Sequence, residues 1–227
     1  MGCALDAPVS ACFADSMRII AGRHRSRRLA PPPESSSTRP LPDRVRESLF
    51  SLLRGHFEDA VVLDGFAGVG SFGLEAMSRG AKRVVLVELD RRVADVLHSN
   101  IELLKAEDET EVVVGDALGP ACLSRCPTPI NIALLDPPYA MVRTPAGWNR
   151  VRQQMARIIA LLHDEGYAMV RTPWPFLQDP EHGDADPVEG DLRIDGALGP
   201  ETHAYGTTAV HLYMRDPEAG KGAETGP

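Results

Sequence analysis

The twenty residues from Val62 to Ala81, VLDGFAGVGSFGLEAMSRGA, decide the fold class of this chain. An apolar stretch ends at an aspartate, three glycines follow in a G-x-G-x-x-G spacing, and a helical pattern runs from Gly73 to Arg79. Glycines permit the tight turn between a strand and a helix, and they let a ligand approach the backbone closely. The stretch therefore predicts a strand, a turn and a helix. On its own it fits a ligand-binding turn or a tight turn without a ligand.

Strand and helix patterns alternate on both sides of this turn. Apolar strands are predicted over 61–63, 83–87, 111–114, 130–135, 167–170 and 205–214, and helices from Asp43 and over 73–79, 91–104 and 150–163. A short strand and a basic loop are expected over Met17–Ala30, and irregular structure or a loose hairpin over Pro173–Pro200. The alternation predicts an α/β fold with a doubly wound, mostly parallel sheet.

An acidic residue ends the next predicted strand. Glu88 follows Gly70 by 18 residues, close to the spacing at which a carboxylate binds ribose hydroxyls. Asp116, after the third strand, is an acceptor suited to the exocyclic amine of adenine. These features leave a nicotinamide dinucleotide and S-adenosylmethionine as alternatives. Asp64 favours the second cofactor, because a carboxylate beside the loop repels a pyrophosphate and attracts a cationic sulfonium or amino-acid group.

The sequence Asp136-Pro137-Pro138-Tyr139 follows the fourth predicted strand, at the same edge of the sheet. Two prolines make a rigid loop that fixes the carboxylate and a backbone carbonyl, both hydrogen-bond acceptors. Together they can hold the two hydrogens of an exocyclic NH₂ and direct its nitrogen toward a methyl donor. Tyr139 offers a flat face on which an extruded base can stack. The loop predicts methylation of a planar amine.

Charge is distributed unevenly along the chain. The formal net charge is −8, which taken alone argues against a nucleic-acid partner. Residues 17–54, however, hold nine arginines against three acids, a net of +6, so the remainder carries −14. The arginines of this segment can contact phosphates without reading sequence. Those we assign to RNA binding are Arg18, Arg23, Arg25, Arg27, Arg28, Arg39 and Arg44.

Targeting signals and metal motifs are not evident. Residues 1–16 lack a basic segment and contain Asp6, so we expect a loose leader rather than a secretory signal. No apolar run reaches the ~18 residues of a membrane helix. Cys122 and Cys126 lack neighbouring histidines or cysteines that would complete a zinc site, so free thiols and no metal are expected. We expect a cytoplasmic protein without a membrane partner.

The motif set resembles amino-methyltransferases that act on nucleic acid, and more closely the RsmD family of bacterial 16S rRNA guanine-N2 methyltransferases. The resemblance runs from Met17 to about Arg215 and includes MRIIAGRHRSRRL, TRPLPDRVRESLFSLL, DGFAGVGSFGLEAMSRGA, VELD, GDA, DPPY and YGTTAVHLYMR. It implies a Rossmann-like class I methyltransferase fold with a seven-stranded sheet and a basic N-terminal extension. Gly65 stands where the family has a large apolar residue, and Val69 replaces a Ser or Thr.

The resemblance also implies a role for individual residues. It assigns the methionine side of the cofactor to Asp64, Phe66, Ala67, Gly68 and Gly70, the ribose to Glu88, and the adenine to Asp116 and Ala117. It assigns the target amine and base to Asp136, Pro137, Pro138 and Tyr139. Arg39, Arg44 and Glu47 belong to a block that closes over the cofactor or meets RNA in such enzymes.

We therefore expect an S-adenosylmethionine-dependent enzyme that methylates guanine N2 in ribosomal RNA or a partly assembled small subunit, acting as a monomer. The alternatives are a DNA adenine-N6 methyltransferase and a non-catalytic cofactor- or RNA-binding module. A DNA enzyme usually carries a sizeable recognition domain, for which this length leaves no room. The expected organisation is a leader over 1–16, a basic extension and helix over 17–58, a methyltransferase domain over 59–215 and a polar tail over 216–227.

Overall fold

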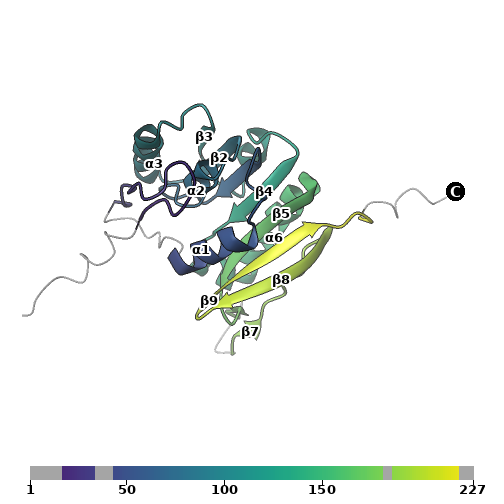
Figure 1. Cartoon of the computed structure of the whole chain (residues 1–227). Coiled ribbons are helices and arrows are strands. Elements are labelled where there is room, and N and C mark those ends of the chain that lie inside the picture. Colours follow the sequence, from purple (N-terminus) through teal and green to yellow (C-terminus); the bar gives the residue numbers. More distant parts are fainter. Residues whose placement is uncertain (1–16, 34–42, 181–185, 220–227) are drawn as a thin grey trace, which may run out of the picture.

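A mixed seven-stranded sheet forms the centre of the molecule (Figure 1). The computed structural model describes residues 17–33, 43–180 and 186–219. The sheet has the strand order β3-β2-β1-β4-β5-β9-β8. Its strands are β1 (Val61–Gly65), β2 (Arg83–Glu88), β3 (Thr110–Val114), β4 (Ile130–Leu135), β5 (Leu162–Pro173), β8 (Ala197–Tyr205) and β9 (Thr208–Arg215).

The first five strands are parallel, and the last two are antiparallel to their neighbours. The sequence order reverses direction between β1 and β4, which is where ligands bind in open α/β sheets. Apolar residues on both faces of the central strands explain this arrangement, because β1, β2 and β4 are buried almost throughout. The predicted doubly wound, mostly parallel seven-stranded sheet is confirmed.

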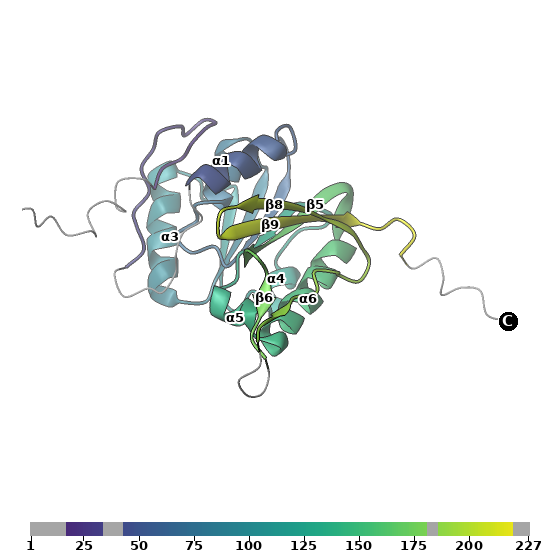
Figure 2. The same cartoon turned by 90° about the horizontal axis from the view of Figure 1, so that it is seen from below.

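Helices cover both faces of the sheet. They are α1 (Asp43–Leu52), α2 (Gly73–Ser78), α3 (Arg91–Leu104), α4 (Pro120–Ser124), α5 (Tyr139–Arg143) and α6 (Pro145–Ala160). Figure 2 shows α1 and α3 on one side of the strands and α4, α5 and α6 on the other. One apolar core lies under α1, α2 and α3 and includes Phe50 and Leu97, while the other lies under α6 and includes Trp148 and Met155.

The structure differs from the sequence expectations near the C-terminus. The strand predicted over 205–214 is one half of a long hairpin, in which β8 pairs with β9 through a turn at Gly206. The strand β8 has only one large aliphatic residue, Leu198, and contains Gly199-Pro200, which is tolerated because β8 is an edge strand with a register shift. Within the Pro173–Pro200 region, β6 (Leu177–Gln178) and β7 (Val188–Glu189) form a small antiparallel pair.

Three of the helices differ from the prediction, one in its start and two because they were not expected. The helix expected from residue 150 begins at Pro145, because the Thr144 side chain accepts a hydrogen bond from the backbone of Gly147 and caps it. The short helices α4 and α5 were not expected from the sequence. Trp148, near the start of α6, is buried against Phe176, and its indole N–H donates to the carbonyl of Asp191.

Within the described ranges, no helix combines the length and apolar character needed to cross a bilayer.

Candidate functional site

Four acidic side chains lie along the carboxyl edge of the parallel strands. Asp64 lies in β1, Glu88 ends β2, Asp116 follows β3 and Asp136 follows β4. The strand register aligns them, since Gly65 pairs with Val87 on one side and with Leu135 on the other. Acids distant in sequence are therefore neighbours along one edge of the sheet.

The glycine-rich turn forms one wall of this edge. The backbone has a positive φ at Phe66 (67°), Gly68 (56°) and Gly70 (89°). The φ at Gly70 favours glycine, and a side chain there would also meet the end of Leu97, while the space beside Gly68 is open. The N–H of Ala67 donates to Val87 at 2.8 Å, which ties the turn to β2. An open, side-chain-free backbone is suited to a ligand that lies against the turn.

Glu88 is buried, and both of its carboxylate oxygens accept hydrogen bonds from the backbone. Oε2 accepts from the N–H of Gly68 at 2.9 Å, and Oε1 accepts from the N–H of Asp90 at 2.8 Å. Each oxygen retains a second lone pair, so the carboxylate can still accept from ribose hydroxyls. The side chain is held rigidly in the position predicted for it at the end of β2.

Asp64 is the most buried of the four acids, at 2% exposure. Its Oδ2 accepts a hydrogen bond from the N–H of Gly73, the first residue of α2, at 2.8 Å. Burial, together with the charges of Asp136 and Glu88, raises the pKa of Asp64 to about 7 against the opposing effect of that hydrogen bond. A site that crowds carboxylates in this way favours a positively charged ligand.

Asp116 and Ala117 lie beside α6. Oδ1 of Asp116 accepts from the N–H of Leu118, and Oδ2 forms a 2.9 Å ion pair with Arg150 of α6. Ala117 is buried, and its carbonyl accepts from the side chain of Gln154. Arg150 and Gln154 were not predicted from the sequence, because only the packing of α6 brings them to the loop after β3.

Asp136 is paired with an arginine that was not predicted from the sequence. Nε of Arg171, in β5, donates to Oδ1 of Asp136 at 2.5 Å, and both side chains are largely buried. The pKa of Asp136 is raised by burial, while the charge and hydrogen bond of Arg171 act to lower it. Arg171 directly follows a predicted apolar strand, so its position at the same edge could have been read from the sequence.

The rest of the predicted amine-binding loop is anchored at two points. Pro138 precedes α5, and its carbonyl accepts from the N–H of Met141 at 2.9 Å, while Pro137 connects it to Asp136. The hydroxyl of Tyr139 donates to Oγ1 of Thr208 in β9 at 2.6 Å. The guanidinium of Arg171 lies 5.2 Å from the centre of the Tyr139 ring.

The basic N-terminal segment folds against the molecule as a hairpin-like loop. Arg18, Arg23, Arg25, Arg27 and Arg28 are all exposed. The tip of the loop contacts Ser78 at the end of α2, and Arg23 pairs with Glu109, just before β3. This tip therefore lies toward the amino ends of the strands, at the opposite edge from Asp136. Arg44 is exposed in the first turn of α1, and Arg39 lies outside the described residues.

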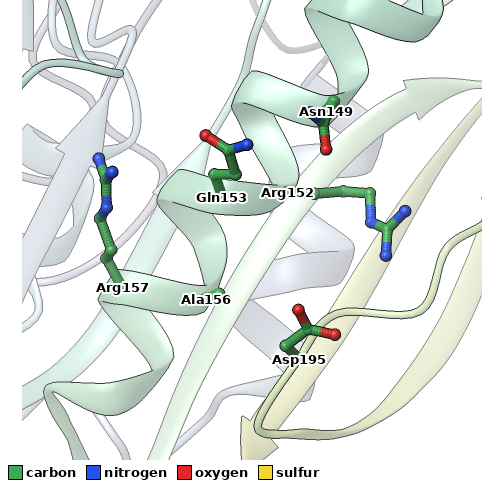
Figure 3. Close-up of a pocket in the computed structure, with 6 residues that line it drawn as sticks. All are labelled: Asn149, Arg152, Gln153, Ala156, Arg157 and Asp195. Atoms are coloured by element: carbon green, nitrogen blue, oxygen red, sulfur yellow. The ribbon is translucent and has the colours of Figure 1, made fainter.

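A cavity on α6 is separate from this cluster (Figure 3). Its lining includes none of the predicted site residues and consists of Asn149, Arg152, Gln153, Ala156, Arg157 and Asp195. Asp195 comes from the loop before β8 and faces the side chains of the helix. Across the described part of the chain, no group of three or more His, Cys, Asp or Glu side chains is arranged to hold a metal ion.

The family model described as Conserved hypothetical protein 95 matches residues 17–174, most of the chain and the whole of the edge just described. The chain belongs to this family. A relative from Escherichia coli K12 named ribosomal RNA small subunit methyltransferase D is 41% identical over 151 residues, which are 66% of this chain and 69% of the relative. A Haemophilus influenzae protein of the same name is 42% identical over 54% of this chain and 64% of its own length. The resemblance to the RsmD family is thus confirmed.

Solved structures agree with this membership. Escherichia coli yhhF superposes with a TM-score of 0.66 at 33% identity, covering 88% of this chain and 97% of that one. An RNA methyltransferase from Salinibacter ruber, in complex with S-adenosyl-L-homocysteine, has a TM-score of 0.52 at 17% identity, covering 83% and 97%. The second likeness concerns the fold alone. The predicted Rossmann-like class I methyltransferase fold is confirmed for this member of the family.

Proposed function

We propose that this protein transfers a methyl group from S-adenosylmethionine to the exocyclic N2 amine of a guanine in small-subunit ribosomal RNA. The observation that carries the proposal is the Asp136-Pro137-Pro138-Tyr139 loop at the end of β4, beside three further acids. Relatives at 41% and 42% identity are named ribosomal RNA small subunit methyltransferase D, which supports the RNA substrate.

The donor set fits S-adenosylmethionine. The cofactor carries positive charge on its sulfonium and amino groups, and the site offers the buried carboxylate of Asp64 with Glu88 nearby. The open backbone at Gly68 leaves room for the cofactor against the turn. In this proposal Asp64, Phe66, Ala67, Gly68 and Gly70 hold the methionine part, Glu88 the ribose, and Asp116 with Ala117 the adenine.

The residues of the loop act by position and charge. When bound, S-adenosylmethionine supplies an electrophilic methyl group at this edge. Asp136 and the carbonyl of Pro137 accept hydrogen bonds from the target NH₂, which orients the nitrogen lone pair. The amine must lose a proton once it is alkylated, and the carboxylate of Asp136 is placed to receive it. Tyr139, anchored to Thr208, supports the base by stacking.

The partner and domain assignments complete the proposal. We infer that the substrate is rRNA, free or in a partly assembled small subunit, and that a monomer acts on it in the cytoplasm. Residues 59–215 provide the catalytic domain, and the basic segment within 17–58 binds RNA phosphates. An adenine-N6 methyltransferase is the alternative, because the same loop chemistry serves that amine.

The test is to supply labelled S-adenosylmethionine with small subunits lacking the modification, with free 16S rRNA and with duplex DNA, and to identify the labelled nucleoside after digestion. We expect N2-methylguanosine from the small subunit or its RNA. Label in N6-methyladenosine from DNA, or no label in any substrate, would contradict the proposal.

Asp136→Ala is the decisive variant. We expect it to lower methyl transfer by about a hundredfold or more, because it removes the acceptor that orients the amine. Binding of S-adenosylmethionine, measured by calorimetry, should survive. Asp195→Ala, on the separate α6 cavity, is the matched control and should leave transfer unchanged.

A further inference from the structure

Arg171 is placed beside the proposed catalytic acid by the sheet itself. Val170 of β5 pairs with Leu135 of β4, so the residues that follow them, Arg171 and Asp136, emerge side by side. Arg171 is only 8% exposed, which is uncommon for an arginine and calls for a charged partner. Its Nε–H donates to Oδ1 of Asp136.

Apart from Arg171, the surroundings of Asp136 disfavour the ionised form of its carboxyl group. The facing groups are Asp64 from β1 with Glu88 beyond it on β2, Tyr139 from the loop, and Arg171 from β5. Burial disfavours a charged carboxylate, and the two acids are like charges. Arg171 supplies the compensating positive charge, and its guanidinium also lies against the ring of Tyr139.

Protonation would change what Asp136 can do. An ionised carboxylate only accepts hydrogen bonds, whereas a carboxylic acid donates one and competes with the hydrogens of the target amine. A protonated Asp136 also cannot take up the proton that the amine releases. The chemistry proposed for this loop therefore requires the ionised form.

We propose that Arg171 is a positioning residue that keeps Asp136 ionised and oriented, engaging Oδ1 so that Oδ2 faces the amine. The inference rests on the function proposed above. Neighbouring Thr172 strengthens the arrangement, since its carbonyl accepts from Thr208, the residue that anchors Tyr139. Both components of the loop, the acid and the aromatic ring, are thus held by the same strand, β5.

The kinetic test compares the pH dependence of methyl transfer in the wild type, Arg171→Met, Arg171→Lys and the exposed-arginine control Arg157→Met. For Arg171→Met we expect the acidic limb of the kcat profile to move to higher pH, with activity falling about tenfold for each pH unit below the new pKa and recovering in alkaline buffer. Arg171→Lys keeps the charge and should retain most of the wild-type profile. A uniform loss at every pH, or no loss, would overturn the proposal.

A second measurement needs no substrate. The Asp136 carboxyl can be followed by carbon NMR of protein labelled at aspartate, with Asp136→Asn identifying its signal. We expect this carboxyl to titrate at higher pH in Arg171→Met than in the wild type, while calorimetry shows that S-adenosylhomocysteine still binds. If Arg171→Met does not fold, Arg171→Gln, which also removes the charge, replaces it in both measurements.

The two measurements separate the inference from the function. An unchanged titration of Asp136 overturns the role of Arg171, even if the enzyme methylates guanine as proposed. A shifted titration with no guanine methylation by the wild type would instead leave the electrostatic role standing and reject the function.

Discussion

Asp64 and Asp136 are both aspartates at the carboxyl edge of the same sheet, but their partners differ. Asp64 accepts a backbone hydrogen bond from Gly73 and, among the described residues, has no arginine at hydrogen-bond distance, whereas Asp136 pairs with Arg171. Burial therefore dominates at Asp64, and its pKa lies at about 7. A buried carboxylate at this residue lowers the stability of the fold at neutral pH, and it lies where a cationic ligand is expected to bind.

We predict that Asp64 makes the stability of the protein depend on pH. The pKa in the folded state, about 7, is above the unfolded value of 3.8, so the folded state binds the proton more tightly. The favourable contribution is fully present below pH 3.8 and is lost as pH rises through about 7. By linkage the loss is on the order of 4 kcal/mol at most.

Asp64→Asn tests this prediction, because the amide oxygen can still accept from Gly73 and does not titrate. The free energy of unfolding of the wild type should fall relative to the variant between pH 4 and 7, and the difference should level off above pH 8, as measured by denaturant titration. Parallel curves for the two proteins would show that burial does not control this carboxyl.

At the scale of elements, one buried glutamate attaches the N-terminal segment to α2. Glu75 is fully buried, and its carboxylate accepts from the N–H groups of Ile20 at 2.6 Å and Ala21 at 3.0 Å as well as from Nε of Arg79. Ser78 and Asn100 add further hydrogen bonds to His24 and Ala30. The basic N-terminal extension expected from the sequence is, over residues 17–33, docked against α2 and α3.

We predict that Glu75→Ala detaches this element. The variant leaves two buried backbone donors and a partly buried guanidinium without their acceptor, which should destabilise the protein by roughly 3 kcal/mol. Hydrogen exchange should increase over residues 18–30 before the sheet unfolds. The exposed Glu107→Ala is the control, and equal exchange in the two variants would rule out this anchoring role.

For the whole molecule, the distribution of charge matters more than its sum. The net charge is −8, yet five exposed arginines lie on the docked segment and four acids occupy the proposed cofactor edge. The basic tip lies near the amino ends of the strands, and the proposed catalytic loop lies at their carboxyl ends. An RNA that contacts both, as in the function proposed above, must extend along the molecule, and we predict that a partly assembled subunit does so better than a short RNA fragment.

We predict that Arg25→Gln combined with Arg27→Gln weakens RNA binding in a salt-dependent way. Removing two phosphate contacts should reduce the slope of log K against log salt concentration by roughly 1.5. Filter binding to small subunits and to a short RNA fragment containing the target would measure this slope, and we expect the larger change with subunits. A slope equal to that of the wild type would place the RNA surface elsewhere. The double variant Arg125→Gln and Arg215→Gln, which removes the same total charge, is the control.

Local patterns in the sequence were sufficient to predict the alternation of strands and helices, the glycine-rich turn and the acids after successive strands. Each is encoded within a few residues: apolar runs specify buried parallel strands, glycines specify the turn at Gly68 and Gly70, and the two prolines specify the rigid loop after Asp136. The order of parallel strands then brings these strand ends to one edge, so the candidate cluster was predictable without coordinates.

Only the tertiary structure decided which partners these side chains have. Arg150 reaches Asp116 across 34 residues, Thr208 reaches Tyr139 across 69, and Glu75 reaches the backbone of Ala21 across 54, and no local pattern encodes such pairing. The β8 strand was missed for a related reason, since an edge strand needs few apolar residues and is defined by the neighbour with which it pairs. The sequence determined which chemical groups stand at the edge of the sheet. Packing determined their charge state and orientation, because both depend on burial and on partners from distant elements.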